Sequence, residues 1–416
     1  MPAIASLLEK ETNFPAWFEE LRTDAWKQYE ELDWPTRKEE HWRFGSYKKA
    51  DFDNIPAASE GEEGELRDLM ENSLRFVFQN HQLITRPEIL PEGLIALPLN
   101  EALVAHPELE NNFPKLQGSL GSKKLAALHR ARCDQGLVLI ASADLETPIE
   151  VIHQISGDQK LVLPYLYIAS KNGGHLRIAE RFISTNDTDA TSVVSVTDVV
   201  SEENSQVTYL ATQELNRQSR MTRLADTRVE KNALGRIAIV HTGAEWAREE
   251  TYSTVDGIDS RSEILSVALP DTGQEYDQRT FQMHAAPDTF SDLLFKNTLF
   301  GEAKTVFSGL IFVDEKAHGT DAYQTCRNLF MSDDCEANSM PGLEINADQV
   351  KCSHGSTSSQ VSTEEIYYLT ARGIRPSSAR RLIAKGFSIE AIQKLNNEPL
   401  EKLAIAVVDR KFAQVD

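Results

Sequence analysis

About 200 residues in the middle of the chain, from 136 to 345, consist of short runs rich in Val, Ile, Leu, Thr and Tyr. Runs such as GLVLIAS, LVLPYLYIAS, TSVVSVTDVV and VFSGLIFV recur roughly every 10 to 15 residues, and Gly, Asn, Asp and Ser fill the gaps. This pattern predicts strands separated by turns. No long amphipathic helix lies between the runs, which excludes βαβ units, whereas a sandwich, a barrel and a parallel β-helix all fit.

Both ends of the chain are predicted to be helical. Apolar residues form a stripe along residues 14–32, a second helix is expected at 120–132, and the acidic stretch at 49–65 has loop composition. Near the C-terminus, Ser362 and Thr363 are cap candidates for a helix that stops at Gly373, and another helix runs from Pro376 to near Gly386. Two short helices are expected at 388–395 and 399–408. We therefore predict an N-terminal helical domain (1–134), a β core (135–348) and a C-terminal helical domain (349–416).

Charge and cysteine content exclude several classes of protein. The formal net charge of -21 opposes binding to nucleic acid or to an anionic membrane surface. The apolar runs are shorter than the roughly 20 residues of a membrane span, and the opening MPAIASLLEKETNF has no signal-peptide pattern, so a cytoplasmic location is expected. None of the four cysteines forms a Cys-x-x-Cys pair, which indicates reduced thiols.

The chain lacks the usual enzyme signatures, including the phosphate-binding loop of ATPases, so it is not expected to hydrolyse ATP by itself. One segment, 350–357, brings together a thiol and an imidazole, at Cys352 and His354. Side chains two apart in an extended segment share a face, and both groups suit iron or zinc if a partner adds ligands. From spacing alone, a packed cysteine and a hydrogen-bonded histidine explain this pair better.

The other candidates are weaker. Cys326 and Cys335 match no common metal spacing and are assigned no role, while His284 and His318, beside strand ends, are expected to be structural. The cluster of Trp34, Trp42 and Phe44 is predicted to anchor a turn.

Several blocks near the C-terminus resemble the SufB/SufD family of the SUF iron–sulfur cluster assembly system. These blocks are GLIFV from Gly309, TDAYQ from Thr320, LEINAD from Leu343, KCSHG from Lys351, and YYL-x-x-RGI from Tyr367. The resemblance is strong over roughly the last 130 residues and weak between about 50 and 200. Ser353-His354-Gly355-Ser356 stands where the SufB branch carries Glu-His-Glu-Ala, which favours the SufD branch.

The resemblance implies a mainly β fold, with a right-handed parallel β-helix core flanked by N-terminal and C-terminal helical domains. It also implies a non-catalytic scaffold without an intrinsic cofactor, which pairs with SufB through the β-helix and binds the ATPase SufC through the C-terminal helices. His354 and Cys352 would lie at the SufB interface, where iron or a transient iron–sulfur cluster could bind, with His354 the tentative metal ligand shared with SufB. The expected SufC-docking residues are Glu364, Glu365, Tyr367, Tyr368, Arg372, Gly373 and Ile374.

Two alternatives stay open. The first is a SufB-like or homodimeric scaffold of the same family, and the isolated chain is expected to form a homodimer through strand edges that SufB would otherwise cover. The second is a β-helix carbohydrate-active enzyme, which the absence of a paired-carboxylate motif disfavours.

Overall fold

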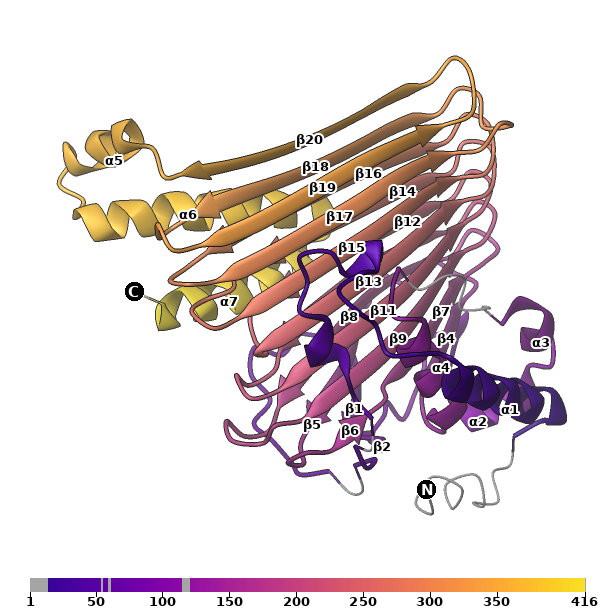
Figure 1. Ribbon diagram of the computed structural model, residues 1–416. Helices are drawn as coiled ribbons and strands as arrows, with labels where there is room; N and C mark the ends of the chain where they lie inside the picture. The colour runs from indigo at the N-terminus through magenta and orange to yellow at the C-terminus, as the bar shows by residue number, and fades with distance from the viewer. Residues whose placement is uncertain (1–13, 54, 59–60, 114–119, 416) are drawn as a thin grey trace.

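The computed structural model describes residues 14–53, 55–58, 61–113 and 120–415, and its centre is a parallel β-helix (Figure 1). The chain alternates between two sheets, so each coil gives one strand to each sheet and successive coils stack in parallel. Met221 pairs with Ala247 one coil later, and Lys304 pairs with Glu336, so a coil takes 26 to 32 residues. The predicted parallel β-helix is confirmed, and the sandwich and barrel alternatives are wrong.

Sheet A begins with β3, which is antiparallel to β4, and continues in parallel order to β19. Its strands are β3 (Leu94–Pro98), β4 (Leu137–Ala141), β7 (Tyr165–Ser170), β9 (Ser192–Ser201), β11 (Arg220–Val229), β13 (Trp246–Val255), β15 (Glu275–His284), β17 (Lys304–Val313) and β19 (Glu336–Ile345), and the short β6 (Leu161–Val162) pairs with β9.

Sheet B begins with the antiparallel pair β1 and β2 and continues in parallel order to β20. Its strands are β2 (Gln82–Thr85), β1 (Leu74–Gln79), β5 (Ile149–Ile155), β8 (His175–Ser184), β10 (Gln206–Glu214), β12 (Leu234–His241), β14 (Arg261–Ala268), β16 (Phe290–Leu299), β18 (Asp321–Phe330) and β20 (Lys351–Gln360).

From β7 onward, the turns that lead from sheet A back to sheet B share one backbone feature. Each of these contains a residue with a left-handed φ between +54° and +76°. Asn and Asp tolerate this conformation better than most side chains, and Gly adopts it freely. The residues are Asn172, Asn204, Asn232, Asp259, Asp288, Gly319 and Gln349, at intervals of 27 to 32 residues. They form a weak sequence repeat that marks successive coils.

The N-terminal helices cover the outer face of sheet A over its first coils (Figure 1). Phe18 of α1 packs with Leu103 and Tyr165, and Trp42 stacks on Trp246 of β13 with ring centroids 6.4 Å apart. The elements are α1 (Ala16–Glu31), η2 (Glu40–Trp42), η3 (Tyr47–Ala50), α2 (Leu99–Ala105), α3 (Leu109–Asn112) and α4 (Lys123–Arg132).

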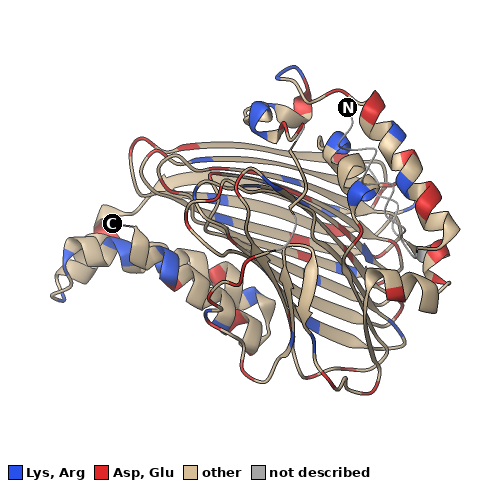
Figure 2. Cartoon of the chain, turned by 90° about the horizontal axis from the view of Figure 1, so that it is seen from below, with Lys and Arg blue, Asp and Glu red and all other residues tan. Residues whose placement is uncertain are grey.

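The C-terminal helices cover the outer face of sheet B, with the exception of α5, which projects from the end of the molecule (Figure 1). Ala384 and Ile392 of α6 and Val408 and Phe412 of α7 are buried against the strands. The elements are α5 (Thr363–Thr370), α6 (Pro376–Ile392), η4 (Gln393–Leu395) and α7 (Glu398–Gln414). Many of the charged residues lie on the helices and turns, whereas most strand residues are uncharged (Figure 2).

The structure differs from the sequence prediction in three places. Strands β1 to β3 lie within the region predicted to be helical. Strand β20 continues sheet B although its sequence is polar, because β18 supplies its hydrogen bonds. Helix α6 does not end near Gly386 but continues to Ile392, since Ser388 and Ala391 are buried on sheet B. The two boundaries between the three predicted domains stay predictions, and the opening MPAIASLLEKETN lies outside the described residues.

Candidate functional site

The last coil leaves the β-helix open at its C-terminal end. Strand β19 pairs only with β17, and β20 pairs only with β18, so each has one edge whose backbone groups have no strand partner among the described residues. Both strands are ten residues long, and nine of the ten side chains of β20 are exposed. Long exposed edges are sites where another chain can add a strand.

Cys352 and His354 both lie on β20 and share its inner face, which continues the space between the two sheets. Cys352 is opposite Ala322 and His354 is opposite Gln324 of β18. Cys352 is half-buried beside Leu343, and burial raises the pKa of its thiol, so it is protonated at neutral pH. His354 is exposed at the open end.

These two side chains do not make a metal site by themselves. Within the described ranges, no group of three or more His, Cys, Asp or Glu side chains is arranged to hold a metal ion. A thiolate and an imidazole are suitable ligands for iron, but a stable site needs further ligands. Those ligands would have to come from another chain at the open end.

The structure adds Cys326 to the inner face near His354, which sequence spacing had not indicated. Cys326 is opposite Ser356 on the neighbouring strand, and its thiol is 3.8 Å from the Ser339 hydroxyl. Burial raises the pKa of the Cys326 thiol to about 12, so this thiol is unreactive while it stays buried. Cys335 lies in the following turn, where its thiol donates to the carbonyl oxygens of Leu299 and Gly301, both at 3.3 Å.

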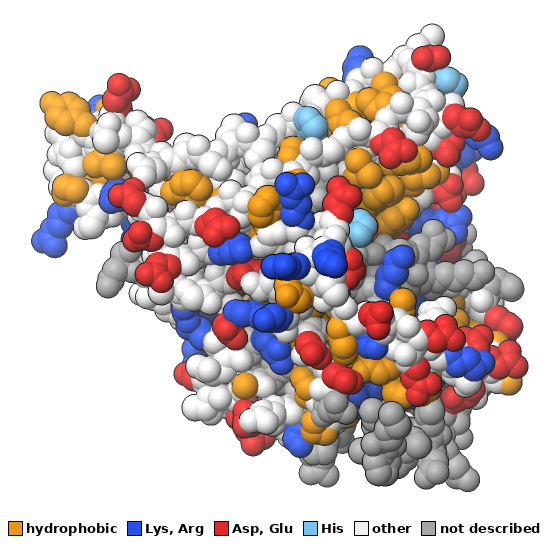
Figure 3. Space-filling view, viewed as in Figure 1, with side chains coloured by type: hydrophobic (Ala, Val, Ile, Leu, Met, Phe, Trp, Pro, Cys, Tyr) orange, Lys and Arg blue, Asp and Glu red, His pale blue; other side chains and the backbone are white. Residues whose placement is uncertain are grey.

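The predicted docking residues lie on α5 and on the turn that follows it. The Ser362 hydroxyl caps α5 by accepting from the Glu365 backbone N–H at 3.4 Å. Tyr367 and Tyr368 are 75% and 57% exposed, and no residue of α5 is buried. Glu364, Arg372 and Gly373 are also exposed, and Ile374 is half-buried. Figure 3 shows apolar side chains at this projecting end of the molecule.

A second apolar surface lies on the outer face of sheet A, close to β19. Tyr252, Phe281 and Phe312 stack from coil to coil, with ring centroids 4.8 and 6.0 Å apart. All three are only half-buried, and the contacts of the N-terminal segment with β13 and β15 lie nearer the start of these strands, at Trp246 and Glu275. The apolar side chains near the open end are visible in Figure 3. Apolar surface beside a free strand edge is typical of protein interfaces.

The histidines beside strand ends differ in environment. His284 is buried, and its two ring nitrogens lie 2.7 and 2.8 Å from the hydroxyls of Thr289 and Ser291, which is a structural arrangement. Burial lowers its pKa to about 4. His318 is exposed, and its Nδ1 lies 3.2 Å from the Asp348 backbone N–H.

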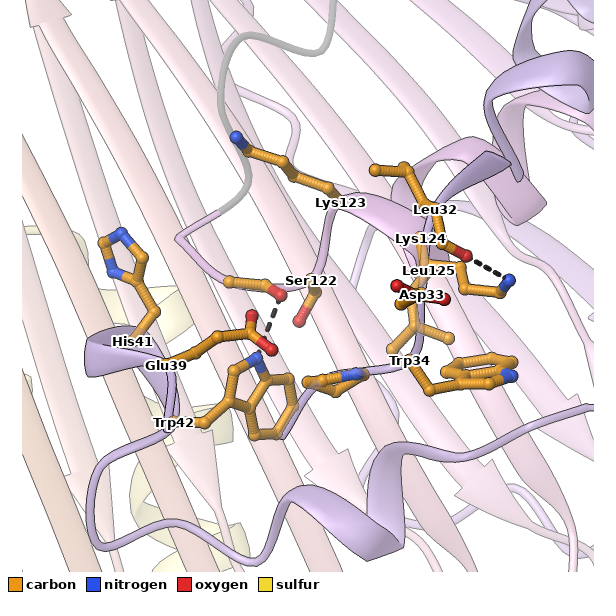
Figure 4. A pocket seen from close by; sticks show the side chains of 12 residues that line it. Leu32, Asp33, Trp34, Glu39, His41, Trp42, Ser122, Lys123, Lys124 and Leu125 are labelled. Carbon is orange, nitrogen blue, oxygen red and sulfur yellow. Dashed lines mark hydrogen bonds between the residues drawn. The ribbon is translucent and has the colours of Figure 1, made fainter. Parts of the chain in front are cut away.

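A small pocket of about 150 Å³ lies between the 32–42 segment and the start of α4 (Figure 4). Two of its polar groups already have partners: the Lys124 ammonium donates to the Leu32 carbonyl, and the Trp42 indole N–H donates to the Gly121 carbonyl at 2.9 Å. Trp34 and Trp42 join the local apolar cluster as predicted, but Phe44 does not, since it is 44% exposed. The contacts around this pocket hold the 32–42 segment against the start of α4.

Comparison with known proteins identifies the family. The family model described as SUF system FeS cluster assembly, SufBD core domain, matches residues 153–387. This chain belongs to the SufBD family. The matched range covers most of the β-helix, the open end with its Cys352–His354 pair, and α5. Membership supports a role in iron–sulfur cluster assembly and leaves the carbohydrate-active alternative without support.

Similar SufBD proteins come from several bacteria. The chain is 26% identical over 420 residues to the iron-sulfur cluster assembly protein SufD of Bacillus subtilis, covering 95% of this chain and 94% of that protein. It is 34% identical over 170 residues to SufD of Escherichia coli, covering 41% and 40%. It is 31% identical over 274 residues to a SufBD family protein of Synechocystis, covering 63% and 60%. None of the helices in the described ranges is long and apolar enough to cross a membrane.

Proposed function

We propose that this chain is a SufD-like scaffold subunit, which pairs with SufB at the open end of its β-helix and assists the formation of iron–sulfur clusters there. The observation that carries the proposal is the pair of free ten-residue edges on β19 and β20, with Cys352 and His354 on the inner face of β20. A second β-helix added at these edges would continue both sheets and enclose the two side chains.

The position of α5 supports docking of the SufC ATPase. An exposed helix whose two tyrosines face solvent is a typical anchor for a partner, because tyrosine buries a large area and keeps a polar tip. Helix α6 connects α5 rigidly to sheet B: the Lys296 ammonium of β16 pairs with Glu390 and lies 4.3 Å from the centre of the Phe387 ring. ATP-driven movement at α5 would therefore reach the strands beside the open end.

In this proposal the subunit is not itself an enzyme. His354 would supply one ligand to iron or to a nascent cluster, and Cys352 a second, with the remaining ligands from SufB. The relatives named SufD favour this role over the SufB-like alternative. In the absence of SufB, the free edges would pair two copies of this chain.

The test is co-purification of the full chain with its cognate SufB and SufC, followed by iron, sulfide and ATPase measurements. His354→Ala should leave the complex assembled and lower its iron and sulfide content several-fold. Ser353→Ala, one residue away on the opposite face of β20, is the matched control and should change neither. Failure of the wild-type chain to form the complex would refute the scaffold role, and unchanged cluster content in His354→Ala would remove His354 from the site.

A further inference from the structure

A polar cavity of about 620 Å³ lies where α7 crosses the turns that lead from sheet B to sheet A. Its walls include Asn186 after β8, Asn216 after β10 and Gly243 after β12, together with Arg410 and Lys411 of α7. The volume is in the range of small-molecule binding sites in proteins. The cavity lies along the β8 to β15 coils, away from the free edges of β19 and β20.

The arginines that line the cavity already have carboxylate partners. Arg181 is fully buried and pairs with Glu214 at 3.2 Å, and Arg410 pairs with the same carboxylate. Arg217 pairs with Asp271 at 3.2 Å. These pairs balance the charges of the cavity wall, so a ligand does not need to neutralise them.

Lys411 is the exception. It is 5% exposed, and its ammonium donates to the Gln274 side-chain oxygen at 3.0 Å. No carboxylate within 4.0 Å forms an ion pair with it in the described part of the chain, although Asp271 of the cavity wall, paired with Arg217, acts on it from farther away. Burial lowers its pKa to about 8, so at pH 7 the side chain is mostly cationic. A buried ammonium with one hydrogen bond and no carboxylate in direct contact is costly, because two of its three N–H donors are unused.

Other unused groups lie at the same cavity. The Arg181 Nε and the Thr185 hydroxyl are buried and have no hydrogen-bond partner in the described ranges. Buried polar groups in folded proteins nearly always have a partner, so unpaired ones beside a cavity indicate an expected occupant. Leu215 and Val407 add apolar surface on which the carbon skeleton of a ligand could pack.

We propose that this cavity is a binding site for a small organic anion, whose phosphate or carboxylate group pairs with Lys411. An anion there would give the buried ammonium its counter-ion and could accept from the unused N–H groups. The site is independent of the scaffold function, since its residues belong to α7 and the middle coils. Its occupant would fix α7 to the turns of three successive coils.

The experiment is calorimetric titration of the full chain at pH 7 and constant ionic strength, with inorganic phosphate and succinate as separate probes. The wild-type chain should bind at least one of them, and the probe that binds more tightly identifies the anionic group. Lys411→Met should weaken binding at least about tenfold, because it removes the cation and keeps the apolar stem. Lys402→Met, on an exposed face of the same helix, is the matched control and should bind like the wild type.

A second measurement does not depend on the folding of the variant. The affinity of the wild-type chain for the bound probe should fall between pH 7 and pH 9, because Lys411 loses its charge. Absence of binding by both probes, equal binding by Lys411→Met, or an affinity that does not change with pH would each overturn the proposal.

Discussion

Buried charges in this protein are almost all paired, and the pairs connect neighbouring coils. The Arg223 guanidinium of β11 is 2.5 Å from the Glu249 carboxylate of β13, and Arg248 of β13 pairs with Asp277 of β15. Breaking such a pair strongly destabilises the fold, because the charge that remains stays buried.

Asp198 on β9 differs from these paired groups. It is fully buried under the N-terminal helices, it accepts from the Tyr165 hydroxyl at 2.8 Å, and its second oxygen has no hydrogen-bond partner in the described ranges.

The Asp198 carboxyl should make stability depend on pH. Burial raises its pKa to about 6, above the value of about 3.9 in the unfolded chain. The folded protein therefore holds a proton that the unfolded chain releases, and this contribution to stability is present below about pH 4 and lost as the pH rises through about 6. Asp198→Asn should raise the free energy of unfolding by about 2 to 3 kcal/mol at pH 7.5, and by about 1 kcal/mol or less at pH 4.5.

Denaturant unfolding at the two pH values measures this difference. Asp187→Asn is the control, since Asp187 is exposed and should give the same small change at both. An Asp198→Asn effect that does not depend on pH would show that the carboxyl is ionised in the folded protein throughout.

At the level of the elements, α6 shows how packing overrides local sequence. Gly386 lies inside the helix on its exposed side, and nothing lies within 4 Å of the position that a Cβ would take. Gly386→Ala should therefore stabilise the protein by about 0.5 to 1 kcal/mol, because alanine loses less backbone freedom on folding.

Gly373 is the matched comparison for Gly386. It also has free space around it, but its φ is +83°, in the left-handed region. Gly373→Ala should destabilise by about 1 kcal/mol. Thermal unfolding should thus move in opposite directions for the two variants, and a lower melting temperature for Gly386→Ala would contradict the helical assignment at that position.

The strands of the core were predictable because apolar residues recur in short runs, but the architecture was not. Coil stacking pairs residues about 30 positions apart, such as Gln324 with His354, and no local pattern records such a pairing. The Asn, Asp and Gly residues that recur at the turns form a repeat in the sequence that could have indicated it. The sequence did not predict that β20 belongs to the sheet, because KCSHGSTSSQ has no alternation of apolar and polar residues. This strand forms because β18 supplies its hydrogen bonds.

The candidate site was predictable in part. The spacing of Cys352 and His354 was enough to infer a shared face, and β20 has them on one. Cys326 joins that face only through the pairing of β18 with β20, so its spacing along the chain carried no signal. The cavity at Lys411 depends on α7 folding back over the turns of distant coils, which is equally invisible in a linear sequence.

For the molecule as a whole, the free edges should govern self-association. The Lys351 N–H donates to the Thr320 carbonyl, so the backbone groups of alternate residues, including those of Ser356, face away from β18. Ser356→Pro should remove one outward donor and weaken homodimerisation at least about tenfold, while edge strands tolerate proline. Ser356→Ala keeps the backbone donor and should dimerise like the wild type.

Light scattering of the isolated chain over a range of concentrations gives the measurement. Equal dimerisation by the proline variant would mean that the two copies associate through another surface, such as the Tyr252–Phe281–Phe312 stack. A wild-type chain that stays monomeric at all concentrations would contradict edge pairing altogether.

The path of the last two helices has a consequence for how the protein is made. A stack of coils bound only to its neighbours can lose them one at a time from an open end. Helix α6 contacts β16 and β14, and α7 continues to β12, β10 and β8, so these helices brace coils that do not touch each other. Both helices follow all of these coils in the sequence, so the brace is synthesised after every coil that it holds. A ribosome that stops before α7 would therefore release a stack of coils that has all its strands but lacks this brace and can fray.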